Sequence, residues 1–244
     1  MPAKKQVDPY QHVSKIYSQL MDFVDYKWWA KYIYSITKVS LPKNPVVLET
    51  GAGNCLLANY LSKHYKNYFA SDISFQMLNQ KKISVKKICC NMTSLPFTQK
   101  FDLIFSAFDS VNYLLTKKDL LKHFNEVSSR LNDDGIFTFD TALENNSYKH
   151  QKTANKTGKY KKYYYKRESL FNPKTKTHKN IFTVIYPDGN IYKETHTQKI
   201  FSFNTFFELA EKSGLYVVNC YKAFSYTKGK ATSDRVQFIM KRKV

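Results

Sequence analysis

The chain has 244 residues, of which 43% are apolar and 16% aromatic, enough to bury one substantial core. Seven glycines and seven prolines exclude a collagen-like chain, and the aromatic content argues against disorder. The net charge of +20 admits a polyanionic partner, but only four of the 39 basic residues are arginines, which nucleic-acid-binding surfaces favour, so a solvated lysine-rich surface is the preferred interpretation.

The first half of the chain alternates between predicted helices and strands. Residues 10–38 predict two helices, with Asp25 as the N-cap of the second. Short apolar runs then predict strands at 46–50, 68–72, 86–92, 101–108 and 135–140, and intervening segments predict helices at 56–65, 74–82 and 117–131. His123, on the last of these helices, is expected at the surface. This alternation predicts βαβ units and a doubly wound, mostly parallel sheet.

From Asn145 to Phe203 the chain is polar and rich in lysine and tyrosine, without a helical period. Eleven basic residues and one acidic residue lie in 149–180, while 49–148 is almost neutral. Segments 160–171, 180–186 and 190–203 predict strands, with a turn at 187–190. We interpret this region as an antiparallel β insertion.

Beyond the insertion, Asn204 is the expected N-cap of a helix over 205–213, with Gly214 just after its end. Strands at 216–224 and 234–242 follow, the last expected to run antiparallel to its neighbours. The predicted fold class is therefore α/β, with a seven-stranded sheet, a β insertion and an N-terminal helical cap. The expected division is a cap over 1–40, a core over 41–145 and 204–244, and an insertion over 146–203.

The segment Glu49-Thr50-Gly51-Ala52-Gly53 ends the first predicted strand. Two glycines allow a ligand close to the backbone, and Asp72, at the end of the next strand, is suitably spaced to bind ribose hydroxyls. A nicotinamide dinucleotide is one candidate, but Leu56 stands where its fingerprint has a third glycine. Glu49 would also repel a pyrophosphate and suit a ligand with cationic groups.

Four segments in order resemble the motifs of class I S-adenosylmethionine (SAM)-dependent methyltransferases: E-T-G-A-G-N, A-S-D-I-S-F-Q-M-L, C-N-M-T-S-L-P-F and F-D-L-I-F-S-A-F-D-S-V-N-Y-L. They span about 46–145. The aromatic helices at 13–33 and the strand E-T-H-T-Q-K-I-F-S further resemble a bacterial branch that includes amino-sugar and glycine N-methyltransferases. That branch often has tyrosine followed by aspartate where Tyr17-Ser18 stands, and arginine where Lys199 stands.

The resemblance implies SAM as the cofactor, with 146–203 on the acceptor side. The cofactor-binding residues that it implies are Tyr17, Trp29, Glu49, Gly51, Ala52, Gly53, Asp72, Ile73, Met77, Asn91, Met92, Ala107 and Phe108. The candidates for catalytic roles are Asp109, Tyr113 and His196. One of them would act as the general base if the methyl-accepting substrate has to lose a proton.

The favoured function is methyl transfer to a small-molecule amine. An RNA or protein methyltransferase that docks through the insertion is an alternative, although Asp109-Ser110-Val111-Asn112 replaces the N-P-P-Y typical of base-amino methylation. A non-catalytic SAM-binding protein is another.

Four cysteines without metal-ligand spacing (Cys55, Cys89, Cys90 and Cys220) and no apolar run of about 18 residues predict a cytoplasmic protein. We expect no metal and no membrane segment, and a monomer or homodimer.

Overall fold

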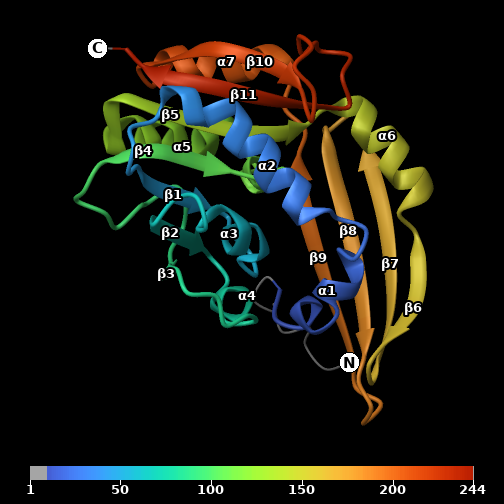
Figure 1. The fold of residues 1–244 in the computed structure, drawn as a ribbon. Coiled ribbons are helices and arrows are strands. Elements are labelled where there is room, and N and C mark those ends of the chain that lie inside the picture. Colours follow the sequence, from blue (N-terminus) through green and yellow to red (C-terminus); the bar gives the residue numbers. More distant parts are fainter. Residues whose placement is uncertain (1–9, 244) are drawn as a thin grey trace.

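The computed structural model describes residues 10–243, and a seven-stranded sheet forms its centre (Figure 1). The strand order is β10-β11-β5-β4-β1-β2-β3. The strands are β1 (Val46–Thr50), β2 (Asn67–Asp72), β3 (Lys86–Cys89), β4 (Phe101–Ser106), β5 (Leu131–Ala142), β10 (Leu215–Lys222) and β11 (Arg235–Arg242). Strands β1 to β5 are parallel, and β11 runs antiparallel to both β5 and β10. The predicted fold class is confirmed.

Helices cover both faces of this sheet. They are α2 (Tyr26–Thr37), α3 (Leu56–Leu61), α4 (Phe75–Leu78), α5 (Lys117–Arg130) and α7 (Phe203–Lys212). Side chains of α2 and α3 pack with Val47, Leu103 and Ile136 in one core, and side chains of α5 and α7 pack with Leu48 and Ile104 in the other. Because neighbouring residues of a strand face opposite sides, each buried strand supplies both cores.

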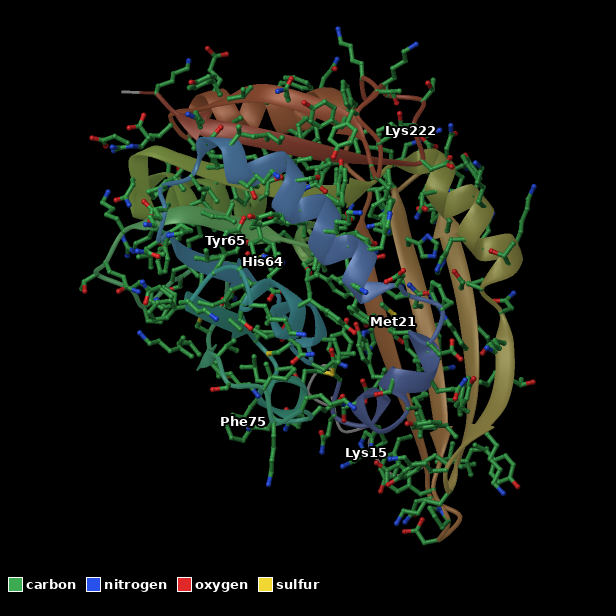
Figure 2. All side chains as sticks on the ribbon, in the orientation of Figure 1. Lys15, Met21, His64, Tyr65, Phe75 and Lys222 are labelled. Carbon is green, nitrogen blue, oxygen red and sulfur yellow. The ribbon has the colours of Figure 1, made fainter. Side chains whose placement is uncertain are left out.

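Local sequence accounts for several of these boundaries. The backbone N–H of Trp28 donates to Asp25 Oδ1 at 2.9 Å, so Asp25 is the N-cap of α2 as predicted. His64 and Tyr65, which follow the end of α3 and are labelled in Figure 2, pack against Tyr34 of α2. Gly214 follows α7 with φ +72°, as its predicted position requires. The prediction for Asn204 is wrong, because α7 begins at Phe203 and Ser202 is its N-cap residue.

A second, antiparallel sheet with the order β6-β7-β8-β9 extends beside the carboxyl ends of the parallel strands (Figure 1). Its strands are β6 (Lys156–Tyr160), β7 (Tyr163–Asn172), β8 (Thr177–Ile185) and β9 (Ile191–Lys199). It corresponds to the predicted insertion, with β6 as an additional strand. The prediction that this region contains no helix is wrong, because Glu144–Thr153 forms α6. The amphipathic pattern of α6 is too weak to indicate a helix from the sequence.

Residues 10–21, here called the N-terminal segment, lie between the two sheets (Figure 1). It contains two short helices, η1 (Val13–Lys15) and α1 (Tyr17–Leu20), which lie near α4 on one side and β8 and β9 on the other (Figure 1). Val13, Ile16 and Leu20 pack with Tyr165 and other side chains of the second sheet in a third cluster. The segment therefore closes one side of the space where the parallel strands end.

The predicted surface position of His123 is wrong, because its side chain is fully buried on the inner face of α5. Its Nδ1 lies 2.9 Å from the carbonyl oxygen of Met92, and its ring packs edge-on against Phe137. Burial lowers the pKa of His123 to about 4, so the imidazole is neutral at pH 7.

This burial predicts acid sensitivity. The folded protein takes up the His123 proton less readily than the unfolded chain, so the free energy of unfolding should fall by about 3 kcal/mol between pH 6.5 and pH 4. His123→Asn, which keeps a donor near Met92, should flatten this part of the profile. Denaturant unfolding at several pH values would measure it, and parallel profiles for both proteins would contradict the prediction.

Candidate active site

A cavity of about 650 Å³ lies where the parallel strands end and the second sheet begins. Open α/β sheets bind ligands at this edge, and a cavity of this size accommodates a small organic ligand. The lining includes Tyr17, Trp29, Ala52, Ile73, Met77, Asn91, Met92 and Phe108 from the predicted cofactor set. Met21, labelled in Figure 2 between α1 and α2, also lines it. Ala107 does not, because it is buried in the core on the α2 side.

The glycine loop after β1 forms one wall. Gly51 and Gly53 line the cavity with φ of +70° and +54°, a conformation that favours glycine. A Cβ added to Gly51 would lie 2.7 Å from Ser110 Oγ, which donates to the Gly51 carbonyl oxygen. The loop after β4 therefore packs closely on the glycine loop, and a side chain at Gly51 would separate them.

Asp72 fixes the glycine loop from the end of β2. Its Oδ2 accepts from the Gly53 N–H and its Oδ1 from the Ser74 N–H, each at 2.8 Å. The carboxyl group lines the cavity, and burial raises its pKa while these backbone hydrogen bonds oppose the rise. The arrangement suits a carboxylate that accepts hydrogen bonds from a ligand, and the ribose role stays a prediction.

The sequence predicts that Glu49 presents a negative charge to the ligand. In the structure Glu49 does not line the cavity. Its side chain is buried, and its Oε2 accepts a 2.6 Å hydrogen bond from the Tyr68 hydroxyl. Burial raises the pKa of Glu49 to about 8, so the carboxyl group is mostly protonated at pH 7. The carboxylate that lines the cavity here is Asp72 instead. The strand's alternation explains the difference, since Glu49 faces the core that contains Val47.

Glu49→Gln should therefore stabilise the protein at high pH. The unfolded chain loses this proton near pH 4.5 and the folded protein near pH 8, so the wild type loses up to about 4 kcal/mol of stability as the pH rises between them. Glutamine removes the ionisation and still accepts from Tyr68. Thermal unfolding should give variant and wild type similar midpoints at pH 5 and the variant the higher midpoint at pH 8; an equal difference at both would contradict this.

The loop after β4 is strained and tied to the rest of the site. Phe108 and Asp109 both have positive φ, and Phe108 packs against Trp29 with ring centroids 4.1 Å apart. Arg235 donates to Asp109 Oδ1 at 3.1 Å, and Gln198 donates to Asp109 Oδ2 at 2.9 Å. Asp109 therefore joins β11 and β9 at the cavity wall, and both of its carboxylate oxygens are engaged by these partners.

Tyr113, from the loop after β4, and His196 of β9 lie close together in the cavity lining. Their rings are 6.4 Å apart, and the Tyr10 ring packs edge-on against His196. The Tyr10 hydroxyl donates to the Tyr113 hydroxyl at 2.9 Å. Burial raises the pKa of Tyr113 to about 12, so this phenol is a neutral hydrogen-bonding group. Tyr17 also lines this part of the cavity.

Glu194 orients His196 and anchors the N-terminal segment. Its Oε2 lies 3.1 Å from His196 Nε2 and accepts from the Tyr10 N–H, while its Oε1 accepts from the N–H groups of His12 and Val13. Burial alone would raise the pKa of Glu194, but hydrogen bonds from His196 and these amides lower it overall. An ionised Glu194 favours the tautomer with a hydrogen on Nε2, which leaves a lone pair on Nδ1.

The second sheet contributes a polar wall that was not predicted from the sequence. Inward side chains of β7, β8 and β9 line the cavity, and with α6 they add His150, Arg167, His178, Asn180 and Gln198. The signal was present as alternation: residues 194, 196 and 198 are all polar and share one face of a strand. Polar residues on a buried strand face indicate a site.

Within residues 10–243, no group of three or more histidine, cysteine or acidic side chains is placed to hold a metal ion. No helix in the same part of the chain has the length and apolarity needed to cross a membrane.

Comparison with known proteins agrees with this geometry. Residues 47–135 match the family described as methyltransferase domain. The putative methyltransferase YqeM of Bacillus subtilis is 30% identical over 138 residues, 54% of each chain, so the match spans about half the length of that relative.

Two solved structures share the fold over almost the whole chain. A SAM-dependent methyltransferase from Clostridium acetobutylicum has a TM-score of 0.78 at 24% identity, covering 96% of this chain and 99% of its own. The sugar N-methyltransferase KedS8 from Streptoalloteichus sp. has a TM-score of 0.74 at 12% identity, covering 95% and 93%. Residues 47–135 therefore match a methyltransferase domain, and the chain as a whole has the fold of these SAM-dependent methyltransferases.

Proposed function

We propose that this protein transfers the methyl group of SAM to the nitrogen of a small-molecule amine. The observation that carries the proposal is one continuous cavity of about 650 Å³, with the glycine loop and Asp72 on one side and the polar wall of the second sheet on the other. That volume suits a nucleoside cofactor with a small acceptor, and the N-terminal segment narrows access for a macromolecule.

The residues around the glycine loop fit the cofactor. Gly51 and Gly53 bring bare backbone to the cavity, Asp72 would accept from the ribose hydroxyls, and Met77 with Asn91 would contact the adenine. SAM supplies a methyl group on a positively charged sulfur that needs no further activation. The chain's task is therefore to align the acceptor nitrogen in line with the methyl–sulfur bond and to exclude water.

An amine is mostly protonated at neutral pH and must lose a proton before it can attack. His196 is suited to take it at Nδ1, since Glu194 engages Nε2 and no hydrogen bond of the described residues engages Nδ1. The Tyr113 hydroxyl would hold the nitrogen beside it. The freed lone pair then forms the new C–N bond as the methyl–sulfur bond breaks, and S-adenosylhomocysteine leaves.

The similarity to KedS8, which is described as a sugar N-methyltransferase, supports an amine over a phenol or a nucleic acid. The lysine-rich strands do not require a polyanion. Lys159 of β6 lies over the Tyr164 ring of β7, and Lys161 and Lys162, in the turn between these strands, lie over the rings of Tyr160 and Tyr163; all three lysines are exposed. These contacts are typical of a solvated surface.

Release of S-adenosylhomocysteine in the presence of SAM and separate pools of small amines, phenols, RNA and protein tests the proposal. We expect product with an amine pool and a mass increase of one methyl group on an amine. Transfer only to RNA or protein would overturn the proposed substrate class. SAM binding without product from any pool would favour a non-catalytic protein.

A further inference from the structure

Arg167 introduces a positive charge into the acceptor side of the cavity. It stands on β7, opposite Phe182 of β8, and its guanidinium carbon lies 5.7 Å from the centre of the Phe182 ring. Phe182 in turn packs edge-on against His196, with ring centroids 5.1 Å apart. Arg167 therefore belongs to the wall that includes the proposed proton acceptor, and it lines the cavity.

In the described part of the chain, the side chains that hold Arg167 in position are neutral. Its Nη2 donates to Asn180 Oδ1 at 3.1 Å and to His150 Nε2 at 2.8 Å, and its Nε donates to the same Asn180 oxygen. His150 Nδ1 lies 3.0 Å from Ser169 Oγ, which is 2.7 Å from His178 Nε2. Burial, followed by repulsion from Arg167, lowers the pKa of His150 to about 4, so this network carries no charge beyond the guanidinium.

Arg167 has no acidic partner among the residues that the structure describes. Within residues 10–243, no carboxylate lies within 4 Å of its guanidinium nitrogens, and none of the hydrogen bonds engages Nη1. The nearby Asp109 is already paired with Arg235. Burial lowers the pKa of Arg167, yet arginine stays protonated in proteins, so the acceptor side of the cavity contains a positive charge with no paired carboxylate among the described residues. A partly desolvated cation without a partner is costly unless a ligand supplies the counter-charge.

We propose that the acceptor amine carries an anionic group, which binds Arg167 through Nη1. This inference rests on the proposed function and narrows its substrate class. One guanidinium flanked by neutral imidazoles balances a single negative charge, so the geometry points to a monoanion such as a carboxylate rather than to a dianionic phosphate ester. The anion would fix one end of the acceptor and leave its amine near His196 and Tyr113.

Binding of small anions to the protein saturated with S-adenosylhomocysteine tests this without any turnover. Acetate and inorganic phosphate are the probes, followed by ligand-observed NMR titration. We expect acetate to bind more tightly than phosphate, and Arg167→Met to weaken acetate by about 10- to 100-fold. Lys166→Met is the matched control, because it removes the same charge from the neighbouring exposed position and should leave acetate binding unchanged.

The outcomes separate this inference from the proposed function. Absence of acetate binding, or equal binding by wild type and Arg167→Met, would overturn the anion site even if an amine is methylated. Tighter binding of phosphate would overturn the monoanion. Acetate binding that depends on Arg167 would support the site even if no amine were methylated, and only the proposed function would then fail. Calorimetry with S-adenosylhomocysteine should show that Arg167→Met retains cofactor affinity, so that lost acetate binding is not a folding defect.

Discussion

Asp72→Ala should lower the affinity for SAM by about 100-fold or more. The change removes the carboxylate expected to accept from the ribose hydroxyls, and each hydrogen bond to a charged group contributes about 1.5–3 kcal/mol. It also frees the Gly53 and Ser74 N–H groups, so the glycine loop loses an anchor at the same time. Isothermal titration calorimetry with SAM and S-adenosylhomocysteine measures the loss.

Asp102→Ala is the matched control for this experiment. Asp102 Oδ2 accepts from the Val46 N–H at 2.8 Å, a bond equivalent to the one between Asp72 and Gly53, but at the amino end of β4, away from the cavity. We expect it to lower the melting temperature and leave cofactor affinity unchanged. Equal affinity losses in both variants would assign the effect to stability, and unchanged affinity in Asp72→Ala would remove Asp72 from the cofactor site.

With an identified methyl acceptor as substrate, His196→Asn should lower kcat by about 100-fold or more. A positioned general base increases the rate by about 10²- to 10⁴-fold. Cofactor affinity should stay close to that of the wild type, since His196 lies on the second sheet. The loss should shrink as the pH rises, because more of the free amine then arrives already deprotonated. Steady-state rates over a pH series, with calorimetry for the cofactor, would measure both effects.

Two further variants define the role of His196. Glu194→Gln keeps the shape of the side chain but removes its charge, so it should lower kcat less than His196→Asn and weaken the anchoring of the N-terminal segment. His64→Ala removes an exposed imidazole that stacks on Tyr34 and should leave kcat unchanged. A pH-independent loss in His196→Asn would indicate a structural role instead of proton transfer.

Local patterns predicted most of the core fold. The strands around 46–50, 68–72 and 101–108 were recognisable because buried parallel strands are short apolar runs with polar loops at both ends. Gly51 and Gly53 were recognisable because their positive φ values exclude most other residues. α6 was missed because its first and last turns are polar and only Ser147 is buried, so tertiary contacts rather than amphipathicity stabilise it.

The candidate site also has features that local sequence predicted and features that depend on tertiary contacts. The sequence by itself determined the α/β class, the glycine loop and Asp72 at the end of β2, because each depends on residues close together in the chain. Only the tertiary structure decided that Glu49 turns into the core, that Asp109 pairs with Arg235, and that Arg167 lines the cavity without a paired carboxylate among residues 10–243. Those outcomes depend on which strand face meets which neighbour across long sequence separations, and alternation alone does not specify the neighbour.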